Sequence, residues 1–105
     1  ELICINAGSS DNSLNILESF NDKRIKIYSQ DNLGISAAKN FGVSVSKYDI
    51  ISFLDADDEW DTNYLKEIYF LYSNYPTCEA YITAYQCNYD NYNRKVIVNT
   101  AVVYF

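Results

Sequence analysis

The chain has 105 residues, one domain at most, because domains commonly contain about 100–150 residues. Its composition (49% hydrophobic, 21% charged) is typical of a globular protein, and its net charge of −6 argues against a surface that follows nucleic-acid phosphates. No apolar run approaches the roughly 18–20 residues of a membrane-spanning helix. Without histidine, acid–base chemistry falls to carboxylates, and any bound metal is expected to be a hard cation.

The two ends of the chain are apolar, with Leu2–Ile5 at the start and Val102–Phe105 at the end. Chain ends normally lie in polar surface segments, so we expect residues 1–105 to be a piece of a longer polypeptide. Exposed apolar edges at Ile3 and Val103 would favour self-association. The three cysteines form no C-x-x-C pair, which favours free thiols in a reducing compartment.

The first 28 residues predict a strand, a helix and a second strand. Residues 2–5 form an unbroken apolar run typical of a buried strand. Ser10 or Asp11 then suits the start of a helix, where a side-chain oxygen accepts hydrogen bonds from free N–H groups. Residues 24–28 alternate between polar and apolar, which indicates a more exposed strand. The expected apolar face of the helix consists of Leu14, Leu17 and Phe20.

Two more helices and a central strand are expected in the middle of the chain. The most apolar strand candidate is Ile50–Leu54, which we place in the centre of the sheet. A third helix is expected with its cap near Asp61 or Thr62. It ends before Pro76, since proline disfavours helical geometry in the preceding residue. The expected inward faces are Ile35, Ala38, Phe41, Gly42 and Val45 in the second helix, and Leu65, Ile68, Tyr69 and Tyr72 in the third.

The last quarter of the chain predicts a hairpin, with strands at residues 79–89 and 96–105. Alternating strands and helices before it imply right-handed crossovers and a mostly parallel sheet. We therefore expect a three-layer α/β/α fold with a C-terminal β-hairpin.

Polar clusters follow the first strand (residues 6–11) and the predicted central strand (residues 55–58). Ligands of open α/β sheets bind beyond the carboxyl ends of the strands. In an extended segment Asp55 and Asp57 would project to the same side and repel each other unless a cation such as Mg²⁺ or Mn²⁺ compensated. The alternative is a solvated acidic turn in which Asp58 or Asp61 caps the next helix.

Two other motif interpretations fail on particular residues. A calcium-binding helix–loop–helix that started at Asp55 would need glycine and a carboxylate where Trp60 and Lys66 stand. An aspartyl-phosphate phosphatase would typically have Thr or Val in the place of Glu59.

Three motifs occur in a particular order: Asn6-Ala7-Gly8-Ser9-Ser10-Asp11, the N-x-G…A-K-N-x-G stretch of residues 32–42, and Phe53-Leu54-Asp55-Ala56-Asp57-Asp58-Glu59-Trp60. In this the chain resembles the family-2 glycosyltransferases over residues 1–68. The resemblance implies the GT-A nucleotide-sugar-binding fold. It also implies inverting, metal-dependent transfer of a sugar from a nucleoside diphosphate to a saccharide or lipid-linked acceptor, in polysaccharide synthesis in the cytoplasm or at the cytoplasmic face of a membrane.

The resemblance also assigns roles to residues. Asp57 would bind the divalent metal, Mn²⁺ or Mg²⁺, and Asp55 would contact the ribose or the metal's water shell. Lys39 stands where the family usually has arginine, near the base or phosphates; its alternative is an exposed helical lysine. The complete implied site comprises Asn6, Gly8, Ser9, Lys39, Asp55 and Asp58 for the nucleotide sugar, and Asp57 and Asp55 for the metal.

The chain departs from the family pattern in two respects. Asn6 and Ala7 replace two acidic residues, so the carboxylate that would bind the base is missing. The family's opening strand, its acceptor-binding half and its general base are also missing. Residues 1–105 are therefore expected to be one partial domain, and no catalytic base can be assigned within it. The alternative function is therefore a non-catalytic binding or interaction module with a degenerate donor site.

Nine of the eleven tyrosines lie beyond Trp60. Eight of these nine suit either a carbohydrate-stacking surface or a core and interface role. They are Tyr64, Tyr69, Tyr72, Tyr75, Tyr81, Tyr85, Tyr89 and Tyr92.

Overall fold

The structure is a computed structural model, and it describes residues 1–84. The elements follow in the order β1, α1, β2, α2, α3. They belong to two compact units whose boundary falls between Phe53 and Leu54. The first unit contains a parallel strand pair with two helices, and the second contains α3.

A parallel pair of strands forms the sheet of the described residues. β1 (Leu2–Asn6) pairs with β2 (Ile25–Ser29) in a register that runs from Leu2 opposite Ile25 to Asn6 opposite Ser29. The ladder continues past the strand ends, where the Gln30 N–H donates to the Asn6 carbonyl at 3.0 Å. Both strands lie where the hydrophobic pattern predicted them, and their parallel direction confirms the expected parallel pairing.

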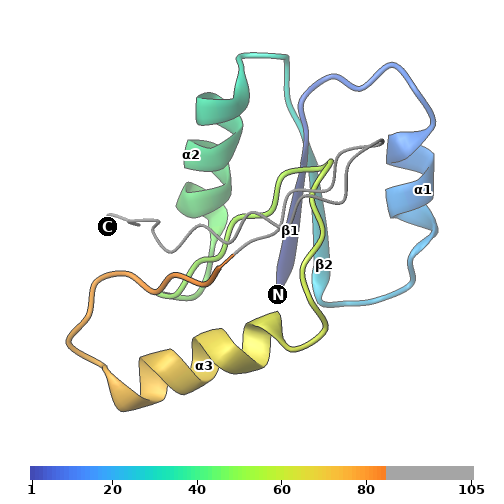
Figure 1. The fold of residues 1–105 in the computed structure, drawn as a ribbon. Coiled ribbons are helices and arrows are strands. Elements are labelled where there is room, and N and C mark those ends of the chain that lie inside the picture. The colour runs from blue at the N-terminus through green and yellow to red at the C-terminus, as the bar shows by residue number, and fades with distance from the viewer. Residues whose placement is uncertain (85–105) are drawn as a thin grey trace, which may run out of the picture. The chain divides into compact units, whose positions relative to one another are not determined.

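Two helices flank the strand pair on opposite sides, α1 (Ser13–Ser19) on one and α2 (Ile35–Val45) on the other (Figure 1). α2 packs on β1 at Gly42, where an added Cβ would make an ordinary contact with Ile5 Cγ1 at 3.8 Å. Between α2 and β2 the rings of Phe41 and Tyr28 meet edge to face, with 5.4 Å between their centroids. Residues 1–53 therefore show the three-layer α/β/α arrangement on a small scale.

The ends and faces of these helices match the sequence in part. Four residues of the predicted α2 stripe are half-buried, but Ile35, the first residue of the helix, is exposed. α1 begins one residue later than expected, with Asn12 as its N-cap. Asp11 nevertheless serves the predicted purpose, because its Oδ1 accepts the Ser13 N–H at 3.0 Å.

The predicted central strand at Ile50–Leu54 was wrong for the described residues, where this segment is in neither strand nor helix. Ile50, Phe53 and Leu54 are exposed. An apolar run supplies side chains for burial, but a strand also needs backbone partners on a neighbouring strand, and the sheet described here contains only β1 and β2.

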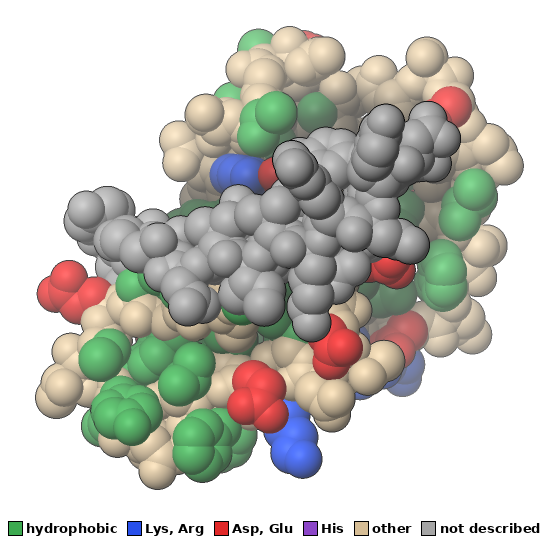
Figure 2. All heavy atoms as spheres, in the orientation of Figure 1, with side chains coloured by type: hydrophobic (Ala, Val, Ile, Leu, Met, Phe, Trp, Pro, Cys, Tyr) green, Lys and Arg blue, Asp and Glu red, His purple; other side chains and the backbone are tan. Residues whose placement is uncertain are grey.

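The N-cap of α3 (Tyr64–Asn74) is Asn63, one to two residues after the predicted cap, and the helix ends, as predicted, before Tyr75 and Pro76. Its predicted inward face was largely wrong. Ile68 is buried, at 7% exposure, whereas Leu65, Tyr69 and Tyr72 are exposed. Hydrophobic side chains gather on the surface over α3, at the lower left of Figure 2. Apolar side chains run consecutively from Ile68 to Tyr72, so they surround the helix instead of forming a single stripe.

Residues 79–84, the start of the predicted hairpin, are not in a strand, and the rest of that hairpin lies outside the described residues. Within residues 1–84 no helix combines the length and apolar character that crossing a membrane requires.

Candidate functional site

The first site loop follows β1 directly. The Asn6 side chain accepts the Ser9 N–H through Oδ1 at 3.0 Å, which closes a four-residue turn. Gly8 has a φ of +79°, a left-handed conformation that strains any residue with a Cβ. Asn6 is half-buried, while Gly8 and Ser9 are exposed. The three predicted residues of this loop therefore come together at the carboxyl end of β1.

A second loop, which follows β2, lies against the first. A Cβ at Gly8 would lie 3.7 Å from the Asn32 Cβ, so the two loops are neighbours. The Asn32 Oδ1 accepts the Gly34 N–H at 3.2 Å, and Gly34, with a φ of +89°, opens α2. The N-x-G motif thus joins a strand end to a helix start beside the Asn6–Ser9 loop.

Gln30 is a residue of this edge that the sequence analysis missed. It follows the last residue of β2, and its side-chain Nε2 is buried without a hydrogen-bond partner. Buried polar atoms are usually paired, so such a donor calls for an explanation. Like Asn6, Gln30 stands in a polar run at the end of a strand, and this position was the sequence signal that could have identified it as a site residue.

Lys39 is half-buried on α2, contrary to the interpretation as an exposed helical lysine. Its Nζ lies 5.8 Å from the centroid of the Phe53 ring, within the range of a cation–π interaction. Phe53 precedes Asp55 by two residues. The cation of α2 therefore lies beside the segment that leads into the acidic cluster.

The acidic cluster forms a turn, and the expected extended geometry was wrong. The Asp58 N–H donates to the Asp55 carbonyl at 3.0 Å, so the alternation of side chains in a strand does not apply to Asp55 and Asp57. Asp55, Asp57 and Asp58 are all exposed. Asp58 does not cap α3; Asp61 accepts the Asn63 N–H through its Oδ1 at 2.8 Å just before that helix.

The acidic turn fits one kind of metal ion. Nowhere in residues 1–84 do three or more Asp, Glu or Cys side chains gather as a preformed cage. Asp55 and Asp57 are exposed residues with carboxylate side chains. Mg²⁺ and Mn²⁺ suit such a donor set, since Mg²⁺ in particular binds through one or two carboxylates and takes its other ligands from water and phosphates.

Local contacts account for the pKa shifts of two other groups, and two cysteines are free. Hydrogen bonds from Ser13 lower the pKa of Asp11 at the start of α1. Burial raises the pKa of the Cys4 thiol in β1. Cys4 and Cys78 are free thiols, as their sequence pattern predicted.

Comparison with known proteins gives the family of the chain. The family model described as glycosyl transferase family 2 matches residues 1–101, and the chain belongs to this family. No solved structure matches it.

Several curated relatives each match about two thirds of the chain. Glycosyltransferase GlyG of Streptococcus pneumoniae is 39% identical over 72 residues, 66% of this chain and 24% of the relative. The cholesterol galactosyltransferase of Borreliella burgdorferi is 38% identical over 71 residues, 66% of this chain and 20% of the relative. The minor teichoic acid biosynthesis protein GgaA of Bacillus subtilis is 43% identical over 74 residues, 66% of this chain and 17% of the relative. The matched part is thus a quarter or less of each relative's length.

Proposed function

We propose that this chain is the nucleotide-sugar-binding part of a glycosyltransferase. The observation that carries the proposal is the edge at the carboxyl ends of β1 and β2. There the Asn6–Ser9 turn, with left-handed Gly8, lies against the loop that opens α2. In α/β folds of this kind a ligand binds in the crevice outside this edge.

We assign the nucleotide to the first unit. Gly8 has no side chain to keep a ligand away from the loop backbone, and Ser9 is exposed beside it. Asn6 and Gln30 present amide groups at neighbouring strand ends, where they suit the polar edge of a base or ribose. Lys39 offers positive charge for the base or the phosphates.

We assign the divalent cation to Asp57 and Asp55, with Asp58 as a further contact to the donor. The cation, Mn²⁺ or Mg²⁺, would supply Lewis-acid stabilisation of the negative charge that develops on the departing nucleoside diphosphate. The two aspartates themselves would hold this cation in place. In this proposal the exposed turn binds metal and donor together.

The complete reaction extends beyond these residues. We propose inverting transfer, in which a carboxylate outside residues 1–105 deprotonates an acceptor hydroxyl, and that hydroxyl attacks the anomeric carbon in line with the leaving diphosphate. One relative is named for cholesterol and another for teichoic acid, so the acceptor class does not follow from similarity. We propose a saccharide or lipid-linked acceptor in cell-surface glycan synthesis.

We place the protein on the reducing, cytoplasmic side, because Cys4 and Cys78 are free thiols. For the rest of the fold we propose a larger GT-A sheet to which the β1–β2 pair contributes two strands. The residues beyond 84 would supply the C-terminal hairpin.

One observation favours a second candidate, a binding module without transfer activity. The Asn6 Oδ1 already accepts the Ser9 N–H, so the residue in the place of the family's base-binding carboxylate has one acceptor site fewer for a ligand. If this candidate is right, the Asn6→Asp variant gains nucleotide affinity and the gene product neither transfers nor hydrolyses a sugar donor.

Calorimetry on the gene product that carries residues 1–105 tests the assignment of the cation. Each titration uses Mn²⁺ with UDP-, GDP- or dTDP-sugar. The Asp57→Asn variant should bind the preferred donor at least about tenfold more weakly, a loss of about 1.4 kcal/mol, because a ligand of the cation is removed. Glu59→Gln is the matched control, since Glu59 is exposed in the same segment and has no assigned role.

Equal donor affinities of wild type and Asp57→Asn would overturn the metal assignment. A wild-type protein that binds none of the three donors would overturn the proposed function itself.

A further inference from the structure

We infer that the stacked pair of Trp60 and Tyr64 is a positioning device for the acidic turn, an inference that rests on the proposed function. The two rings lie 4.5 Å apart between centroids, with an interplanar angle of 23°. They connect the segment that carries the carboxylates to the first residue of α3. Neither ring is assigned a contact with the ligand.

The burial of this segment points to the pair as its anchor. From residue 55 to residue 64 every side chain is exposed except Trp60 and Tyr64, which are half-buried. Two large rings that shield each other from water are favourable in this offset, nearly parallel arrangement. In this segment the aromatic pair therefore supplies the side-chain burial.

Backbone contacts place the pair between two turns. On one side the Asp58 N–H donates to the Asp55 carbonyl at 3.0 Å. On the other side Asp61 accepts the Tyr64 N–H through its carbonyl at 2.9 Å and the Asn63 N–H through Oδ1. Trp60 lies two residues after the first turn, so fixing its ring limits how far Asp57 and Asp58 can move from α3.

The need for such an anchor follows from charge. Carboxylates crowd the segment, and like charges at this spacing repel each other. The residues are Asp55, Asp57, Asp58, Glu59 and Asp61. Without a restraint the segment would separate its charges before a cation arrived, and binding would have to restore the turn. The stack holds the segment that carries Asp55 and Asp57 at the start of α3, so less order is lost when metal and diphosphate bind.

The test compares aromatic variants in the same gene product. The readout is the dissociation constant of Mn²⁺, measured by electron paramagnetic resonance with and without UDP, beside helix content from circular dichroism. Tyr64→Ala should weaken Mn²⁺ binding in the presence of UDP about tenfold, the lower end of the effect seen when residues that support metal ligands are removed. Tyr64→Phe keeps the ring and should stay within about twofold of wild type.

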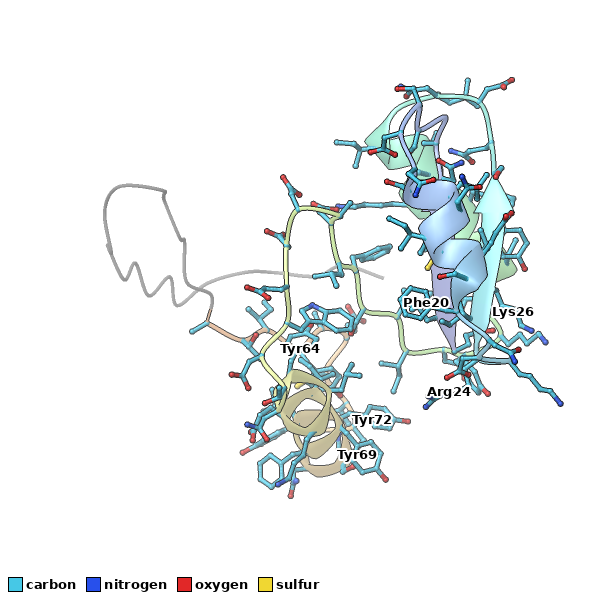
Figure 3. All side chains as sticks on the ribbon, turned by 90° about the vertical axis from the view of Figure 1, so that its right-hand side faces the viewer. Phe20, Arg24, Lys26, Tyr64, Tyr69 and Tyr72 are labelled. Carbon is cyan, nitrogen blue, oxygen red and sulfur yellow. The ribbon has the colours of Figure 1, made fainter. Side chains whose placement is uncertain are left out.

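Two further variants separate positioning from general damage to α3. Tyr69→Ala is the control, since Tyr69 extends from another side of the same helix and is 71% exposed (Figure 3). It should leave Mn²⁺ binding unchanged. Trp60→Leu removes the other ring of the stack, which lies outside the helix. It should therefore weaken Mn²⁺ binding as Tyr64→Ala does, while helix content is retained.

Wild-type affinity in both Tyr64→Ala and Trp60→Leu would overturn the inference, as would an equal loss in Tyr69→Ala. If Asp57→Asn weakens binding and the two ring variants do not, the inference fails and the proposed function stands. If the wild type itself binds no Mn²⁺ with UDP, the proposed function fails, and the inference fails with it.

Discussion

The two units of this chain hold their site residues in different ways. In residues 1–53 the structure is built from contacts between distant parts of the sequence, such as β1 with β2, Gly42 with Ile5, and the Lys47 N–H with Glu1 Oε1 at 2.8 Å. In residues 54–84 the contacts are local. The hydrogen bonds and the Trp60–Tyr64 stack described above join residues close in the chain, and the edge-to-face pair of Tyr72 and Tyr81 spans nine positions. The edge at the carboxyl ends of β1 and β2 is thus held by tertiary packing, and the acidic turn by its neighbours in the chain.

The largest expected effect comes from the packing of the first unit. Phe41→Ala removes a half-buried ring that meets Tyr28 between α2 and β2. We expect a loss of about 2–3 kcal/mol in the free energy of unfolding, somewhat below the range for a fully buried ring. The measurement is the urea midpoint, followed by tryptophan fluorescence and circular dichroism.

The matched variant in the second unit is Phe70→Ala on α3. Phe70 is 57% exposed, so its removal should change the unfolding free energy by no more than about 0.5 kcal/mol. Similar losses in Phe41→Ala and Phe70→Ala would remove the contrast between the two units.

A smaller effect is expected at the start of α2. Gly34→Ala should cost about 1–2 kcal/mol through backbone strain alone, because φ is +89° and a Cβ there would meet no atom within 4 Å. Gly42→Ala is the control: Gly42 lies inside the helix and an added Cβ would make an ordinary contact with Ile5 at 3.8 Å. Thermal unfolding should show it neutral or more stable by up to about 1 kcal/mol. A destabilised Gly42→Ala protein would contradict this packing.

The smallest effect concerns a local contact within the first unit. The hydrogen bonds and charge of Arg24 lower the pKa of Asp22 from 3.8 to about 2. Because the folded pKa is lowered, the stabilisation is present above the unfolded value near 3.8 and is lost as the pH falls through about 2. Both side chains reach solvent, so the change in stability should be slight.

An NMR titration of the Asp22 carboxyl carbon measures this shift. In Arg24→Gln the pKa should return toward 3.8. A carboxyl that titrates near 3.8 in the wild type as well would show that the ion pair does not persist in solution.

The candidate site could be predicted from sequence where chemistry depends on local residue types. Turn formers after an apolar strand located the Asn6–Ser9 loop, and the N-x-G motif located the start of α2. Gln30 escaped notice because an unpartnered buried amide is a property of packing, and no residue type reveals it. The acidic turn was expected as an extended segment because periodicity does not report a backbone hydrogen bond between Asp58 and Asp55.

The sequence alone determined the alternation of strands and helices in residues 1–45, because hydrophobic periodicity and turn residues act over a few positions. It also determined the family, through motifs in a set order. Tertiary structure decided that Ile50–Leu54 forms no strand among the described residues and that α3 buries Ile68 instead of a full stripe. Strand pairing and burial depend on partners far away in the chain, and a local pattern does not contain those partners. The length that first suggested one small domain therefore covers a packed β1–β2 edge and a locally built acidic turn.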